Sequence, residues 1–222
     1  MATVYANTSD GSQTCPLQTS WNDAHDHVGQ GNPNTTAGEH SSNGIRYEYV
    51  TARGAPRYYL CRSFFDFDTS GISSAPSAAT FKLKAYSQNN ASPGIVAKSG
   101  HDPSTTSDDW FSTWNTGQSV TLSGWGASDI TAYSSSTAIN SVGSYTDFTL
   151  NSDALSDMAS LSTFKICVLH NNDYNDVAPT SGIPRTGFYF ANATDAADRP
   201  YIDYTAATVS TTDNATFFGS NF

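Results

Sequence analysis

Two histidines flank an aspartate near the start of the chain. His25, Asp26 and His27 stand in a row, and Asp23 lies two residues before His25. Imidazole nitrogens and carboxylate oxygens are ligands that zinc and other transition metals accept. The polar residues around this row supply no clear further ligand, so a solvated loop is the simpler interpretation.

Oxygen-bearing side chains crowd a second segment, which follows a strand-like run. These are Asn171, Asp173, Asn175 and Asp176. Calcium binds about six to eight oxygens, often on a loop. The glycine and the final glutamate of an EF-hand are missing, and Asn and Asp are ordinary turn residues. The segment therefore predicts either a calcium site or a plain turn; no other cofactor is expected.

Aromatic side chains form a third candidate site. Sugar rings stack their apolar faces on flat side chains, and Trp110, Trp114, Trp125 and Tyr133 could build such a platform for a glycan. Tryptophans of a β-sandwich also serve in the core or between subunits. Both interpretations stay open from the sequence.

Catalytic motifs are absent from the sequence. It contains no G-x-S-x-G, H-E-x-x-H or P-loop pattern, and its only glutamates are Glu39 and Glu48. Asp108 and Asp109 are adjacent acids, but a catalytic acid/base pair is recognised by the distance between its carboxyl groups and by their shifted pKa values, which sequence cannot show. We therefore predict a non-catalytic protein, with a polysaccharide-degrading enzyme as a less favoured alternative.

Composition limits the partners of the chain. Ten Lys and Arg against 20 Asp and Glu give a net charge of −10, which repels a phosphate backbone and disfavours nucleic-acid binding. No stretch approaches the roughly 20 apolar residues of a membrane span. The start of the chain lacks the basic and apolar regions of a signal peptide, so we expect no export signal.

The three cysteines do not suggest a disulfide framework. Cys15, Cys61 and Cys167 are odd in number and lack C-x-x-C spacing. Cys61 and Cys167 lie in strand-like runs, where a free cysteine behaves as a small apolar residue. A single Cys61–Cys167 bridge between sheets remains an alternative.

Short strands separated by polar turns dominate the chain. The clearest is 80–87, where Phe81, Leu83 and Ala85 alternate with polar residues. Ser152 is expected to cap a short helix over 152–161. This pattern predicts an all-β fold, an antiparallel β-sandwich of the jelly-roll kind. Further strands are expected at 45–49, 57–67, 95–98, 120–122, 146–150, 164–170, 187–190 and 200–204.

One domain is expected over residues 1–205, with an irregular segment at about 6–44. Residues 206–222 form a polar tail that ends in an apolar tip containing Phe217, Phe218 and Phe222. This tip either packs on its own domain or docks into the pocket of a neighbour.

Three blocks carry a family resemblance. Residues 62–72 (RSFFDFDTSGI), 78–86 (AATFKLKAY) and 199–204 (RPYIDY) occur in the order and spacing of the DNRLRE-type carbohydrate-binding-module-like β-sandwich, which this chain resembles over about 45–205. The resemblance implies a sandwich of the kind that occurs on secreted polysaccharide-degrading enzymes, on cell surfaces and, as a stand-alone domain, in phage virion proteins.

The resemblance and the chain ends together favour a phage structural protein, either a capsid decoration or a tail component. Such a protein would act through contacts with other virion proteins, as a homo-oligomer, and could also adhere to host glycans. Its location would be the virion. The alternative is a carbohydrate-binding module of a secreted or cell-surface protein.

Overall fold

Antiparallel strands make up most of the molecule. A computed structural model describes residues 1–27, 32–34, 44–90, 93–100 and 124–208 of the 222-residue chain. All of the strand pairs in this described part run antiparallel, and the helices are short. The predicted all-β sandwich is confirmed, and none of the described helices is long and apolar enough to cross a membrane.

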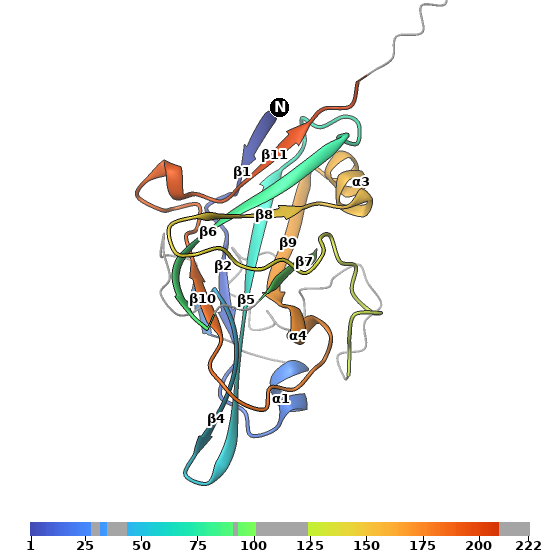
Figure 1. The fold of residues 1–222 in the computed structure, drawn as a ribbon. Coiled ribbons are helices and arrows are strands. Elements are labelled where there is room, and N and C mark those ends of the chain that lie inside the picture. The colour runs from blue at the N-terminus through green and yellow to red at the C-terminus, as the bar shows by residue number, and fades with distance from the viewer. Residues whose placement is uncertain (28–31, 35–43, 91–92, 101–123, 209–222) are drawn as a thin grey trace, which may run out of the picture.

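The first sheet holds both the start and the end of the described chain. Its strands, in order of pairing, are β1 (Ala2–Tyr5), β11 (Tyr201–Thr205), β6 (Ala78–Asn89) and β8 (Tyr145–Thr149). Tyr5 pairs with Tyr201, and Tyr201 pairs with Lys82. Three strands far apart in sequence are thereby brought side by side (Figure 1).

The second sheet is built around the long strand β5 (Ala55–Asp68). This strand pairs with β4 (Ile45–Ala52), β2 (Gly11–Thr14) and β9 (Thr163–His170). Next to these partners lie β10 (Arg185–Phe188), β7 (Gly94–Lys98) and β3 (Asn32–Asn34). The sequence did not predict β2, because its residues Gly-Ser-Gln-Thr are polar although the strand is buried.

Strand β6 belongs to both sheets. Residues 78–84 pair with β11 and β8, whereas Ala85 to Asn89 pair with β10 of the second sheet. The register between β6 and β10 shifts at Gly187/Phe188, and such a bulge lets a strand turn a corner between sheets. The two sheets are therefore joined through hydrogen bonds as well as through the core.

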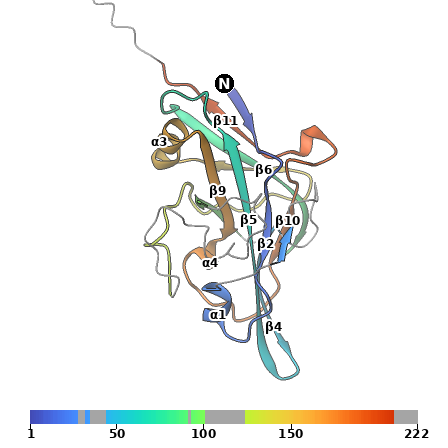
Figure 2. The same ribbon diagram turned by 180° about the vertical axis from the view of Figure 1, so that it is seen from behind.

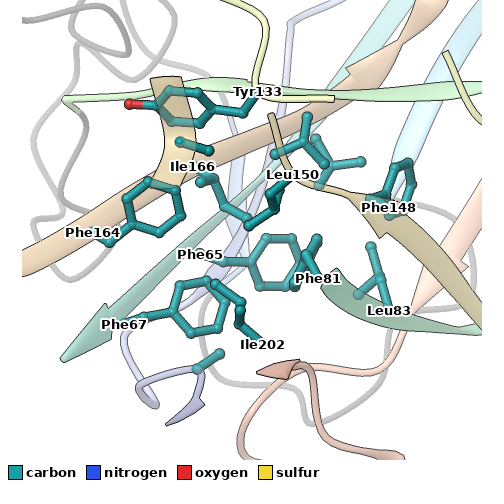
Figure 3. Close-up of a cluster of buried hydrophobic side chains, with 14 of the residues drawn as sticks. Phe65, Phe67, Phe81, Leu83, Tyr133, Phe148, Leu150, Phe164, Ile166 and Ile202 are labelled. Carbon is teal, nitrogen blue, oxygen red and sulfur yellow. The ribbon is translucent and has the colours of Figure 1, made fainter. Parts of the chain in front are cut away.

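Aromatic side chains fill the space between the sheets. Phe81, Leu83 and Phe148 from the first sheet meet Phe65 and other side chains from the second sheet (Figure 3). Phe81, Leu83 and Ala85 are fully buried, as their period of two predicts, and Lys82 and Lys84 point outward.

Short helices cover part of the outer side of the second sheet. Helix α1 (Trp21–His25) contacts β5, and α4 (Asn171–Tyr174) contacts β9 and β7 (Figure 2). The segment at 6–44, predicted to be irregular, therefore contributes β2 and α1. Helix α3 (Ser152–Ser160) confirms the predicted helix, but Asn151 caps it rather than Ser152. A single 3-10 turn, η1 (Ala196–Asp198), precedes β11.

Strands β4 and β5 form a hairpin that extends away from the body of the molecule (Figures 1 and 2). Their pairing runs from Arg46–Cys61 to Ala52–Ala55. Arg53 and Gly54 make the turn with φ of 54° and 78°, the left-handed conformation that two-residue hairpin turns require.

Candidate binding surface

Tyrosines gather on the outward side of the first sheet. Since side chains alternate along a strand, burying Phe81 and Leu83 directs Lys82 and Lys84 to the outside, together with their partners on β1, β8 and β11. We call this surface the tyrosine face. Its aromatic members are Tyr5, Tyr145 and Tyr201 on the first sheet, and Tyr86 and Tyr189 at the junction where β6 passes to β10 of the second sheet.

The rings of the tyrosine face pack in tilted or edge-to-face pairs. Tyr201 lies 5.6 Å from Tyr5 at 48°, and 5.2 Å from Tyr145 at 72°, between ring centroids and planes. Tyr86 and Tyr189 are 5.2 Å apart at 88°. Tyr5 is 54% exposed, and the other four are partly exposed. The result is an uneven aromatic surface on the outward side of the paired strands.

Lysines and carboxylates lie between the rings. The Lys82 ammonium donates to both Asp147 oxygens at 2.8 Å, and this contact raises the pKa of Lys82. Lys84 pairs with Asp198 of η1, and its nitrogen lies 5.5 Å from the centre of the Tyr145 ring. Charges of both signs are therefore held in place beside aromatic rings.

The phenol of Tyr145 fixes the segment before β11. Its hydroxyl lies 2.7 Å from the Ala197 carbonyl oxygen and 3.0 Å from that of Arg199. Burial raises the pKa of Tyr145 and that of Tyr201, so both stay neutral at physiological pH. At these two positions the tyrosine face thus offers neutral phenols rather than phenolates.

Hollows flank β8 on this side of the sandwich. One, of about 340 Å³, is lined by Thr80, Lys82, Asp147 and Asp203, among others. Another, of about 370 Å³, is lined by Asp147 and by polar residues that include Ser134, Thr137 and Asn151. The Asp147 carboxylate lines both hollows, and its side chain is 55% exposed.

The predicted aromatic platform is wrong for the two of its members that can be placed. Trp125 is 2% exposed and Tyr133 is fully buried, so neither ring offers a face to a ligand. Trp125 stacks on His25 at 4.0 Å, and Tyr133 stacks on Phe164 at 5.2 Å and donates to Asp157. Trp110 and Trp114 lie outside the described residues.

The predicted calcium segment has another role. Residues 171–174 form α4, and both Asp173 oxygens accept hydrogen bonds from Arg62 at 2.8 Å. The carboxylate of Asp176 accepts from the Trp21 indole, and the Asn175 amide donates to the Asn171 carbonyl. The side chains of Asp173, Asn175 and Asp176 are thus used in separate contacts within the protein rather than directed together at one cation.

His25 is buried rather than solvated, which corrects the loop interpretation. Its Nδ1 lies 2.7 Å from an Asp26 carboxylate oxygen, and its Nε2 lies 3.0 Å from the Asp173 carbonyl oxygen. The second Asp26 oxygen accepts from the Gly124 amide. Among the residues described, no group of three or more His, Cys, Asp or Glu is arranged to hold a metal.

The cysteines and the apolar tip complete the comparison with the sequence predictions. Cys15, Cys61 and Cys167 are free and buried, so the alternative of a Cys61–Cys167 bridge is not realised. Phe217, Phe218 and Phe222 fall outside the described part of the chain.

Sequence reasoning missed the tyrosine face. The available signal was the polar position of each alternating strand: Lys82, Lys84 and Tyr86 occupy successive outward positions on β6. Tyr145 and Tyr201 begin the two strands that flank β6. Which strands become neighbours depends on the sheet order, which this pattern does not reveal.

Comparison with known proteins adds no identity. No family model matches the chain. No curated protein matches it either. The resemblance to the DNRLRE-type sandwich therefore stays a prediction from the three sequence blocks.

Proposed function

We propose that the protein is a non-catalytic structural protein of a phage particle, in which the tyrosine face holds a neighbouring virion protein. The observation that carries this proposal is the gathering of five exposed or partly exposed tyrosines on one outward surface, where Tyr5, Tyr145 and Tyr201 form one set of ring contacts and Tyr86 and Tyr189 form another. Tyrosine is enriched at protein interfaces because its ring buries apolar area and its hydroxyl still forms hydrogen bonds. The sequence resemblance supports the setting in a virion.

The ring geometry favours a protein partner over a sugar chain. A row of sugar rings stacks best on aromatic faces that lie open side by side, whereas these neighbouring rings are tilted by 48° to 88°. A tilted cluster presents edges, faces and hydroxyls together. Protein side chains of mixed shape can pack against such a surface.

The use of the buried charges supports a non-catalytic role. Arg62 and Asp173 are buried and satisfy each other, and His25 is enclosed between Asp26 and the α4 backbone. A general acid or base has to reach its substrate. These groups instead fasten α1 and α4 to the second sheet.

Cross-linking within purified phage particles tests this proposal. The protein should be present in stoichiometric amounts, and amine-reactive cross-links from Lys82 and Lys84 should reach another virion protein or another copy. Lys98, which pairs with Asp157 away from the tyrosine face, serves as the matched control. Absence of the protein from particles, or cross-links from Lys98 only, would refute the proposal.

Glycan binding at the same surface is the second candidate function. The specific observation is the pair of hollows beside Asp147, where carboxylate, hydroxyl and ammonium groups could bind sugar hydroxyls. The protein would then be a carbohydrate-binding module of a particle, a secreted protein or a cell-surface protein. A glycan array with and without Ca²⁺, repeated with Asp147→Asn, tests it; a blank array would discard this candidate.

A further inference from the structure

The outer part of the β4–β5 hairpin lacks support from the rest of the described molecule. Near its base, the amides of Tyr47 and Tyr49 donate to the carbonyls of Pro184 and Gly182, and Tyr58 exchanges backbone hydrogen bonds with Gln18. Beyond Tyr49 and Tyr58, the hydrogen bonds among described residues are those of the hairpin itself. We call residues 50–57 the arm.

The arm is exposed and positively charged. Its sequence, VTARGAPR, contains Arg53 and Arg57 and no acidic residue, in a protein whose net charge is −10. Thr51 to Gly54 and Pro56 are exposed. The Arg57 side chain contacts only the Pro56 carbonyl in the hydrogen bonds of the described part. An isolated two-stranded hairpin is marginally stable in water, so contact with a partner would stabilise the outer part of the arm.

The tyrosine face carries the carboxylates and aromatic rings that complement the arginines of the arm. Three carboxylates lie on or beside it, those of Asp147, Asp198 and Asp203, whereas it carries two lysines, Lys82 and Lys84. The Asp147 side chain is half exposed and lines the same hollow as Asp203. Arginine forms forked hydrogen bonds with carboxylates and stacks on aromatic rings. The end of the first sheet that carries β1 and β11 also lies at the opposite end of the molecule from the arm (Figure 1).

We propose that the arm of one copy binds the tyrosine face of a second copy, with Arg53 and Arg57 directed toward the hollow at Asp147 and Asp203. This inference rests on the proposed function, because it names the occupant of the same surface. The second copy is favoured as partner because the arm and a complementary surface occur on the same chain, at opposite ends. Such head-to-tail contacts form closed rings or open filaments rather than two-fold dimers.

Two complementary variants test the arrangement. Arg53→Glu/Arg57→Glu leaves the face intact, and Asp147→Asn/Asp203→Asn leaves the arm intact. In sedimentation velocity runs, the native chain should assemble, and rising salt should dissociate the assemblies. Each variant alone should bind itself at least about tenfold more weakly than the native chain. An equimolar mixture of the two should form dimers, because one arm and one face remain functional.

The matched control is Arg53→Lys/Arg57→Lys, which keeps the charge and should retain assembly at reduced affinity. Circular dichroism should show the native β-spectrum for every variant, since the changed side chains are exposed or lie on the outer side of the sheet. A monomeric native chain, an unchanged Arg53→Glu/Arg57→Glu assembly, or a mixture that stays monomeric would each overturn the inference. If virion cross-links from Lys82 and Lys84 then reach a different protein, the proposed function stands and only its partner changes.

Discussion

Arg62 occupies the interior of the molecule with its charge compensated on several sides. Its guanidinium binds both oxygens of Asp173 and the His25 carbonyl, and it lies 4.9 Å from the centre of the Trp125 ring. The attraction of Asp173 raises the pKa of Arg62 against the opposing effect of burial. A buried charge of this kind depends on its specific partners, so removal of the Asp173 carboxylate exposes the cost of burying Arg62.

Asp173→Ala should destabilise the protein strongly. It leaves the fully buried Arg62 without its carboxylate, and such losses typically cost about 3–5 kcal/mol. Urea unfolding followed by tryptophan fluorescence measures the change. The free energy of unfolding should fall much less in the double variant Arg62→Met/Asp173→Leu than in the single variant, because no charge is then left unpaired. Equal losses would show that packing rather than charge dominates.

His170 makes the stability depend on pH. Burial lowers its pKa from 6.5 to about 4, and its Nδ1 accepts a hydrogen bond from the Asn172 amide as a neutral ring does. The folded chain therefore favours neutral His170. This stabilisation is complete above pH 6.5 and is lost as the pH falls toward 4, by about 3 kcal/mol in total.

The difference in unfolding free energy between the native chain and His170→Phe, measured across this pH range, isolates the effect. Asp10 contributes with the opposite sign, because burial raises its pKa and its stabilisation is lost as the pH rises. That contribution is present in both chains and cancels in the difference. A difference that does not change with pH would contradict the neutral buried state of His170.

At the scale of elements, helix α3 depends on one residue outside the segment that the sequence identified. The Asn151 side chain accepts hydrogen bonds from the amides of Asp153 and Ala154, both at 3.1 Å. Ala154 and Met158 then anchor the helix in the core. The cap is therefore the polar side chain that ends the preceding strand region rather than the serine that opens the helix.

Asn151→Ala should cost about 1 kcal/mol, because two helix amides lose their acceptor. Ser152→Ala is the matched control and should change stability by less than about half of that, since alanine is favoured within a helix. Thermal unfolding of the two variants measures the comparison. A larger loss for Ser152→Ala would restore serine as the cap.

The sequence predicted most strands, and the reasons for its failures are local. Alternation identified β6 because its inward residues are apolar, whereas β2 escaped notice because Ser12 and Gln13 are buried polar residues. Trp125 is buried by residues that are distant in sequence, including Phe64 of β5 and His25 of α1, and α1 is a helix of five residues that carries little periodicity. Residue type alone thus suggested a binding platform where the structure has a packed interior.

At the scale of the whole molecule, β6 links the two sheets into one hydrogen-bonded unit. Its first half pairs in one sheet and its second half in the other, while Phe81 lies in the core between them. Detachment of β6 would therefore break strand pairs in both sheets. We infer that the sandwich unfolds as one cooperative unit.

Phe81→Ala should lower stability by about 3–5 kcal/mol, because it leaves a cavity in the shared core. Hydrogen exchange measured by mass spectrometry should show protection reduced by similar amounts in β11 and in β9, one from each sheet. A loss confined to β11 would mean that the sheets unfold separately.

The three cysteines give this molecule a practical property. All of them are buried, and burial raises the pKa of Cys15 and Cys61 to about 12 and that of Cys167 well above its ordinary value. The thiolate is the reactive form, so the cysteines of the folded chain should not react with maleimide dyes. Arg53→Cys would place one accessible thiol at the tip of the arm, where a fluorophore would report its surroundings without any native cysteine being removed. Uptake of further dye would then mark the moment at which the sandwich opens.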